Sequence, residues 1–175
     1  MECENKLYTR PSYLTTVHPC NIGTILHHLN EKDFDLNAHY QRDYVWGPKE
    51  RFELMESILS DRPIGSVCVT IRDRSLNEGY LEVVDGKQRI TTIQKFINNE
   101  FDHRGYYWRD LDRTEQNQIK HIKIGWILLE MRDEQAIVDD SVILDYFYGV
   151  NFTGQPQSEE HKNHIINLMG GKQWS

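Results

Sequence analysis

The side chains best suited to chemistry lie in one short stretch, Asp85 to Thr92, which reads Asp-Gly-Lys-Gln-Arg-Ile-Thr-Thr. Lysine and arginine bind phosphate well, and the planar arginine fork donates several hydrogen bonds at once. The Asp85 carboxylate can hold a metal ion or orient a water molecule, while Gln88 can donate or accept a hydrogen bond. The set suits phosphate chemistry. The same residues are also compatible with a plain Asp-Gly turn that carries a solvated lysine and a surface ion pair.

These side chains are positioned by a predicted strand, a tight turn and a helix. Leu81–Val84 is apolar and β-branched, which is typical of a buried strand, and apolar residues then recur at helical spacing over Ile90–Ile97. Gly86 stands between the two, where a glycine lets the backbone turn sharply. The helix would direct its free N–H groups at whatever lies above the strand. Lys87 and Arg89 therefore share a predicted anion site with the helix N-terminus.

A second group of polar and aromatic side chains, Tyr40-Gln41-Arg42-Asp43-Tyr44-Val45-Trp46, occupies a predicted loop. Loops held on a scaffold are where binding and catalytic residues collect. Arg42 can reach a second phosphate. Tyr44 and Trp46 can stack on a base or anchor the following helix, and anchoring is favoured because aromatic residues usually bury a large area.

The remaining elements predict an α+β fold in which the Val67–Ile71 and Leu81–Val84 strands pair. Further strands are predicted over Phe34–Leu36 and Ile124–Met131. Helices are predicted over Asn21–Leu29, Pro48–Leu59, Leu111–Ile122, Glu134–Tyr148 and Ser158–Met169. The inward residues expected in the fourth of these helices are Ile137, Ile143, Leu144 and Phe147. No repeat or linker marks a boundary, so residues 1–175 are predicted to form a single domain.

Composition limits the class of protein. The chain has 175 residues and a net charge of -7, from 20 Lys and Arg against 27 Asp and Glu. Such acidity disfavours a protein that coats nucleic acid nonspecifically, because phosphate neutralisation supplies that binding, but it leaves room for a local basic cleft. No apolar run approaches the roughly 20 residues that cross a bilayer, and no signal peptide is evident. A cytoplasmic protein with no membrane partner is predicted.

The histidines do not match a metal-binding pattern. His161 and His164 are three residues apart and His27 and His28 are adjacent, but neither pair has a carboxylate or thiolate at a recognised ligand spacing. Ordinary exposed or hydrogen-bonded histidines are the favoured interpretation. No Walker loop, nucleophile elbow or zinc-protease motif occurs either.

The two polar stretches, in this order and separation, resemble the amino-terminal domain of GmrSD-type modification-dependent restriction proteins, a family that includes the SspE-like defence proteins. The family pattern is QRxYxW followed by a strand that ends in DGQQRxTTL. Here these motifs read Gln41 to Trp46 and Asp85 to Ile93, with Lys87 in place of the first glutamine of the second motif. A third stretch, Phe147–Gln157, resembles the aromatic-x-x-x-Asn-x-x-Gly segment of the family. The resemblance covers about residues 14 to 169.

The resemblance implies a ParB/sulfiredoxin-like fold, a small mixed sheet flanked by helices. It also implies a nucleotide-handling pocket in which the DGQQR-type motif supports NTP binding and hydrolysis that controls DNA restriction. The catalytic residues carried over are Asp85, Gln88 and Arg89. The nucleotide-binding residues expected are Gln41, Arg42, Gly86, Lys87, Arg89 and Thr91, of which Lys87 departs from the family motif, keeping a polar side chain and adding a charge. Mg²⁺ is the expected cofactor, held by Asp85.

Three functions follow as hypotheses. The first is a nucleotide-binding domain with Mg²⁺-dependent NTP hydrolysis linked to DNA restriction, defence or counter-defence. The second is a ParB-like DNA nuclease, which the missing pair of metal-binding carboxylates disfavours. The third is a non-catalytic inhibitor or adaptor that binds a partner protein or a DNA-processing complex, with its acidic surface mimicking DNA. The chain ends at Ser175 without the HNH-like nuclease domain of the full restriction proteins, so DNA or a restriction or defence protein is the expected partner.

Overall fold

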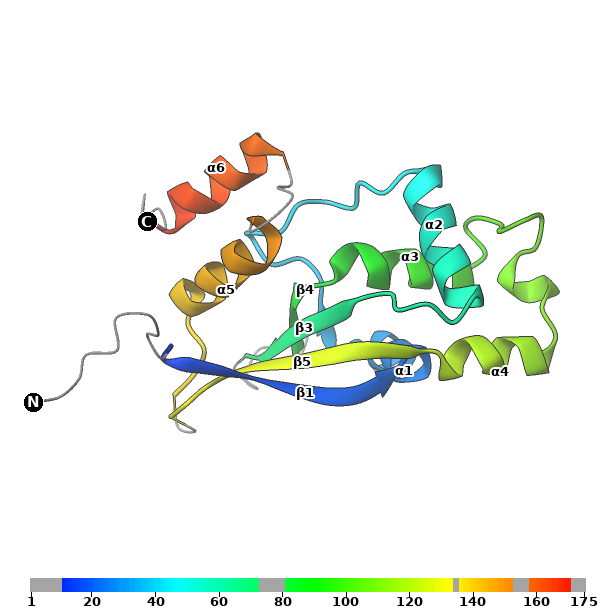
Figure 1. Cartoon of the computed structure of the whole chain (residues 1–175), viewed down its shortest axis with the longest axis horizontal. Coiled ribbons are helices and arrows are strands. Elements are labelled where there is room, and N and C mark those ends of the chain that lie inside the picture. Colours follow the sequence, from blue (N-terminus) through cyan, green and yellow to red (C-terminus); the bar gives the residue numbers. More distant parts are fainter. Residues whose placement is uncertain (1–10, 73–80, 134–135, 153–157, 171–175) are drawn as a thin grey trace, which may run out of the picture.

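One mixed sheet with helices packed against it forms the described part of the chain, which is residues 11–72, 81–133, 136–152 and 158–170 of a computed structural model (Figure 1). The strands are β1 (Tyr13–Asn21), β2 (Phe34–Asp35), β3 (Ser66–Ile71), β4 (Leu81–Asp85) and β5 (Lys123–Met131). The helices are α1 (Ile22–Glu31), α2 (Pro48–Leu59), α3 (Lys87–Ile97), α4 (Arg113–His121), α5 (Asp140–Phe152) and α6 (Glu159–Leu168), with a 3₁₀ turn at Trp108–Asp110. The predicted α+β class, a small mixed sheet flanked by helices, is confirmed.

The sheet has the strand order β1-β5-β3-β4-β2. The expected pair, β3 and β4, is antiparallel, with Val69 opposite Val83. β5 lies parallel to β3 on one side and antiparallel to β1 on the other, and β2 lies parallel to β4. β3 is therefore the middle strand, and the β4–α3 junction starts from the strand beside it.

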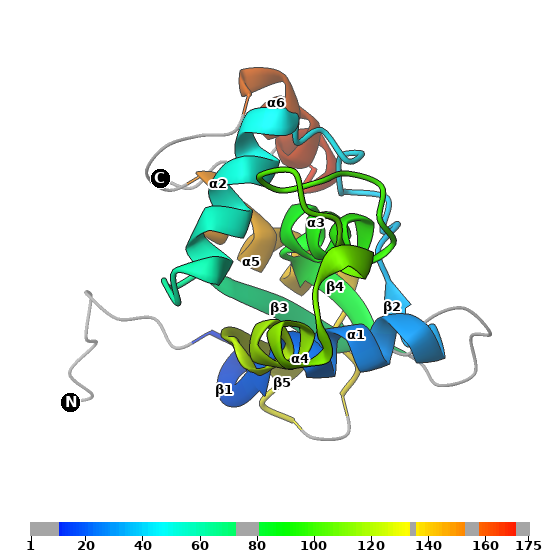
Figure 2. The same cartoon turned by 90° about the vertical axis from the view of Figure 1, so that its right-hand side faces the viewer.

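Alternate residues of β3 and β4 enter two separate cores, because side chains of a strand point to opposite faces of its sheet. Val67 and Val83 pack with residues of α1, α2, α3 and α4. Cys68 and Val84 pack with residues of α5 and α6. Figures 1 and 2 show the same division, with α5 and α6 grouped at one end of the molecule and α1 and α4 together at the other. The loop before α2 connects the two groups.

Two elements differ from the prediction, one strand that was missed and one helix that begins later than expected. The edge strand β1 was not predicted, since Thr, His and Pro interrupt its apolar pattern, and Pro19 is tolerated because an edge strand needs fewer hydrogen bonds. The helix predicted from Glu134 begins at Asp140 instead, because Asp139 Oδ1 accepts the Val142 N–H at 3.0 Å and so starts the helix. Ile137, expected to face inward, consequently lies before the helix and is 63% exposed.

Of the helices in the described ranges, none has the length and apolar character required to cross a membrane.

Candidate functional site

The strand–turn–helix junction predicted around Gly86 is present. β4 ends at Asp85, and α3 begins at Lys87. Gly86 between them has a φ of 105°, a left-handed conformation that favours glycine, and a Cβ there would lie 2.5 Å from Val67 Cγ1. No side chain caps the N-terminus of α3. Its first N–H groups and the positive end of the helix dipole are therefore available to an anion.

Arg89, in the first turn of α3, joins the helix to β3 and β4. Its Nη2 donates to Asp85 Oδ2 at 2.9 Å and also to the main-chain oxygen of Ser66. The Arg89 Nε is buried and has no hydrogen-bond partner within the described residues. Within the described residues, neither Arg89 Nη1 nor Asp85 Oδ1 takes part in the contacts of the Arg89–Asp85 pair. Each member of the ion pair thus keeps hydrogen-bonding capacity.

Two glutamines hold the 40–46 loop against this junction. Gln88 Nε2 donates to the Asp43 carbonyl at 2.9 Å, and Gln88 Oε1 accepts the Val45 N–H at 3.0 Å. Gln41 Nε2 donates to the Val84 carbonyl at 3.2 Å. The predicted loop is therefore fixed to both β4 and α3, and both polar ends of the Gln88 side chain are engaged in fixing it.

The sequence favoured Tyr44 and Trp46 as anchors of the following helix, but the contacts of Tyr44 are with α3. The Tyr44 hydroxyl lies 2.9 Å from Thr92 Oγ1, and Lys95 Nζ lies 5.6 Å from the Tyr44 ring centroid. Trp46 is half-buried against the α1–α4 core and also lines the cavity described next. Tyr44 is thus held on α3, whereas Trp46 contributes both packing and cavity wall.

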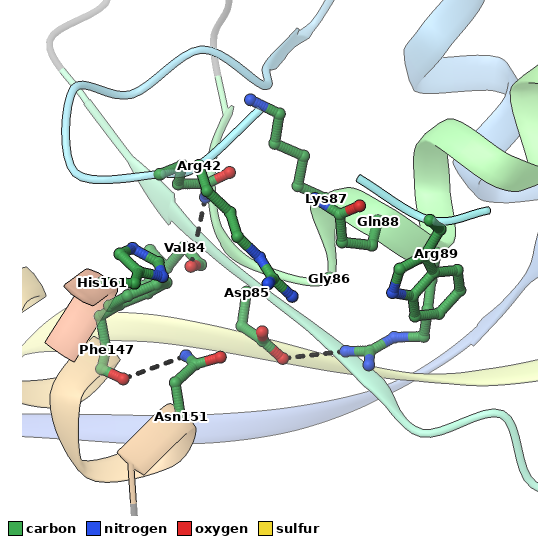
Figure 3. Close-up of a pocket in the computed structure, with 12 residues that line it drawn as sticks. Arg42, Val84, Asp85, Gly86, Lys87, Gln88, Arg89, Phe147, Asn151 and His161 are labelled. Carbon is green, nitrogen blue, oxygen red and sulfur yellow. Dashed lines mark hydrogen bonds and ion pairs between the residues drawn. The ribbon is translucent and has the colours of Figure 1, made fainter. Parts of the chain in front are cut away.

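The loop, the junction, α5 and α6 enclose a cavity of about 130 Å³ (Figure 3). Its lining residues are Gln41, Arg42, Trp46, Val84, Asp85, Gly86, Lys87, Gln88, Arg89, Phe147, Asn151 and His161. The structure therefore brings together every residue carried over from the resemblance except Thr91, which lies on α3 but does not line this cavity.

The cavity is positively charged although the chain is acidic. Three cations, Arg42, Lys87 and Arg89, face one carboxylate, that of Asp85. Within the described residues only Arg89 of the three cations forms an ion pair. Burial lowers the pKa of the Arg42 guanidinium from its ordinary value, yet an arginine stays protonated at neutral pH. Partly buried cations that lack a counter-ion favour an anionic ligand.

Three further lining residues come from the last two helices. Phe147 and Asn151 are one helical turn apart on α5, where Asn151 Nδ2 donates to the Phe147 carbonyl at 3.0 Å. His161 comes from the first turn of α6, and its Nε2 lies 3.3 Å from the Tyr40 carbonyl oxygen, so Nε2 carries the proton. Burial lowers the pKa of His161. Sequence reasoning quoted Phe147 and Asn151 in the third motif but assigned no site role to His161, which only the packing of α6 brings to the cavity.

A family model described as the GmrSD restriction endonuclease, N-terminal domain, matches residues 22–169, a range that includes every residue of the cavity. The chain belongs to this family. The resemblance seen in the sequence is therefore confirmed, and a restriction system is the context of the cavity. The comparisons with curated proteins and with solved structures found no match. Gly154 and residues 155–157 of the third motif lie outside the described residues.

Within the described residues of this GmrSD N-terminal domain, no three His, Cys, Asp or Glu side chains gather into a metal site. His28 instead lies 3.0 Å from Asp33, and His103 lies 2.8 Å from Glu56. In the cavity, Asp85 is the single carboxylate, and Gln41 Oε1 is a buried oxygen without a hydrogen-bond partner. A metal ion in this cavity would need most of its ligands from a bound molecule and from water.

Proposed function

We propose that the cavity binds the phosphates of a nucleoside triphosphate together with Mg²⁺ and hydrolyses it slowly, and that this step is linked to DNA restriction or defence. One observation carries the proposal. Arg42 and Lys87 line a cavity at the uncapped N-terminus of α3, and no ion pair within the described residues involves either side chain. In a chain of net charge -7, this is a local site for a multiply charged anion.

The basic groups have distinct tasks in this proposal. Arg42, from the loop, and Lys87, from the helix start, bind the β and γ phosphates. In Figure 3 the Arg42 guanidinium extends toward Asp85, whereas the Lys87 side chain extends away from it, so Lys87 turns toward the phosphates when they bind. Arg89 adds its Nη1 group, because its Nη2 is already bonded to Asp85. Charge stabilisation dominates phosphoryl transfer, so these groups supply most of the expected rate.

The acidic and amide groups fit a magnesium ion that arrives with the nucleotide. Mg²⁺ is usually held by one or two carboxylates, phosphate oxygens and several waters, and it neutralises charge on the phosphates. Asp85 supplies the carboxylate through Oδ1, while Oδ2 stays with Arg89. Gln41 Oε1 is the second oxygen available on this side. Gln88 holds the loop that carries Gln41 and Arg42, and so acts as a positioning residue.

The size of the cavity agrees with phosphate binding. A volume of about 130 Å³ is well below the roughly 300–1,000 Å³ typical of pockets that enclose a whole small molecule. The cavity therefore suits the phosphates, and the base and ribose must lie elsewhere. A DNA nuclease is less well supported, because one carboxylate already paired with an arginine does not make a two-metal site.

The test is phosphate release from each of the four NTPs with Mg²⁺. We expect turnover in the wild type and a loss of about 100-fold or more in Arg42→Ala and Arg89→Ala, the size seen when a preorganised charge donor is removed. Asp85→Ala should lose turnover through loss of the metal ligand. Arg42→Ala is the cleanest of the three, since the Arg42 side chain forms no ion pair or hydrogen bond within the described residues.

Arg62→Ala is the matched control, because Arg62 is an exposed arginine beside β3 that does not line the cavity. It should keep wild-type turnover, and circular dichroism should show all variants folded. Wild-type turnover in Arg42→Ala and Arg89→Ala would disprove the assignment. Metal-dependent nicking of plasmid DNA that is lost in Asp85→Ala, without NTP turnover, would establish the nuclease instead.

A further inference from the structure

A second and larger cavity, of about 550 Å³, adjoins the phosphate cavity and shares three of its residues, Asp85, Arg89 and Asn151. Its other lining residues are Ser66, Cys68, Ile127, Tyr146 and Val150. The Asp85–Arg89 ion pair is thus a common wall, with the phosphate cavity on one side and this second cavity on the other.

Apart from the ion pair, the walls of the second cavity are two surfaces that carry no charged side chain. Ser66 and Cys68 are two residues apart on β3 and share a face of the sheet, where Cys68 is paired with Ile127 of β5. Opposite them, Tyr146 and Val150 are one helical turn apart on α5. A sheet face and a helix face with few charges cannot replace the hydration of a phosphate, but they can cover both sides of a flat ring.

We infer that this second cavity receives the base of the nucleotide whose phosphates occupy the first. The inference rests on the proposed function and adds the part of the ligand that the smaller cavity has no room for. The two cavities meet at the ion pair, so a single molecule can lie across Asp85 and Arg89 with a charged end on one side and an aromatic end on the other.

Polar groups at the edge of the second cavity give it the means to select a base. The Ser66 side-chain hydroxyl forms none of the hydrogen bonds recorded within the described residues, whereas its main-chain oxygen is bonded to Arg89. Burial raises the pKa of the Cys68 thiol and of the Tyr146 hydroxyl, so both groups stay neutral. Neutral donors and acceptors beside aliphatic and aromatic side chains, here Ile127, Tyr146 and Val150, are typical of sites that recognise the polar edge of a base.

The test separates the base from the phosphates by comparing an NTP with inorganic tripolyphosphate, both with Mg²⁺, in calorimetric titrations. Val150 is 48% exposed at the cavity, so Val150→Trp should fold and fill the space. We expect it to weaken NTP binding about tenfold or more, the loss of one stacked base, and to leave tripolyphosphate binding unchanged. Val17→Trp is the matched control, since Val17 is a 72% exposed valine on β1, away from this cavity.

A second variant, Ser66→Ala, tests whether the cavity discriminates among the four bases rather than whether it has room for a base. It should change the ratio of affinities among the four NTPs while tripolyphosphate binds as before. The inference is overturned if Val150→Trp binds NTP normally, if it weakens both ligands equally, or if the wild type binds NTP no more tightly than tripolyphosphate. In each of those cases the proposed function stands. A wild type that binds neither ligand overturns the proposed function itself.

Discussion

Two arginine–carboxylate pairs whose carboxylates both lie on β4 show how similar residues take different roles. Glu82 and Asp85 both lie on β4, and each is bonded to an arginine, Arg72 at 2.7 Å and Arg89 at 2.9 Å. The two arginine side chains are nearly equally exposed, at 24% and 22%. Burial of the cations therefore does not distinguish the two pairs.

The difference lies in how completely each pair is hydrogen-bonded. Glu82 also accepts the Tyr40 hydroxyl at 2.7 Å, and Arg72 also donates to the Val138 carbonyl at 2.9 Å and to Asp140. Every nitrogen of the Arg72 guanidinium thus has an acceptor, which is the arrangement of a structural network.

The Arg89 pair, by contrast, keeps a buried Nε without a partner and stands beside the cations Arg42 and Lys87. A saturated network fixes a fold, whereas an unsaturated one keeps groups for a ligand. The two are coupled through the loop, because Tyr40 ends the first network and immediately precedes Gln41 and Arg42. The saturated pair therefore positions the residues that serve the unsaturated one.

The largest expected effect is a difference in how much each pair contributes to the free energy of unfolding. Glu82→Ala removes a 6% exposed carboxylate and leaves the Tyr40 hydroxyl and Arg72 Nε without their acceptor, so the free energy of unfolding should fall by about 3 kcal/mol. Asp85→Ala breaks a pair with a more exposed carboxylate and should lower the free energy of unfolding by less than about 1 kcal/mol, even though we expect it to abolish turnover. Urea unfolding measures both.

Glu31→Ala, at an exposed glutamate that ends α1, is the control for removing a carboxylate as such. It should change stability by about 0.5 kcal/mol or less. Equal losses in Glu82→Ala and Asp85→Ala would show that the two pairs do not differ as their hydrogen bonds indicate.

A smaller effect is expected from a substitution at Tyr40, the residue through which the two networks are coupled. Tyr40→Phe keeps the ring, which packs edge-on against Phe147, but removes the hydrogen bond to Glu82. Stability should fall by about 1.5 kcal/mol, the value of a buried hydrogen bond to a charged group. Because the loop also loses its tether, the KM for the NTP should rise more than kcat falls. Steady-state kinetics would detect this, and an unchanged KM would contradict the coupling.

The motif was predictable because its chemistry is local. Asp85, Gly86 and Lys87 are consecutive, and the change from a strand pattern to a helical one on either side of Gly86 is visible in the sequence. The left-handed φ of Gly86 and the close approach of Val67 give the physical reason for the glycine. The resemblance named Gln41 and Arg42 as nucleotide-binding residues, and the structure brings both to the cavity that Asp85 lines.

The rest depended on contacts between distant segments. His161 reaches the cavity because α6 packs on α5, and no local spacing indicates that packing. The start of α5 was misjudged because a single side chain, Asp139, caps it. The strand β1 was missed because an edge strand can be polar and can include Pro19. Local patterns predicted most helices and strands and the motif. Capping and tertiary packing determined which residues of α5 and α6, such as His161, line the cavity.

The smallest expected effect is a pH dependence of stability that His161 contributes. Burial lowers the pKa of His161 below its ordinary value of 6.5, so the unfolded chain takes up a proton before the folded one does. Stability contributed by the neutral ring is complete above that value and is lost as the pH falls from there to the folded-state pKa. Between about pH 7.5 and about pH 5.5, His161→Asn should therefore lose less stability than the wild type. Urea unfolding at both pH values, with exposed His27→Asn on α1 as the matched variant, isolates this contribution. Identical losses of stability in the wild type and in His161→Asn would show that His161 is not held neutral by the cavity. His161 would then not belong with the groups that the fold keeps ready for a ligand.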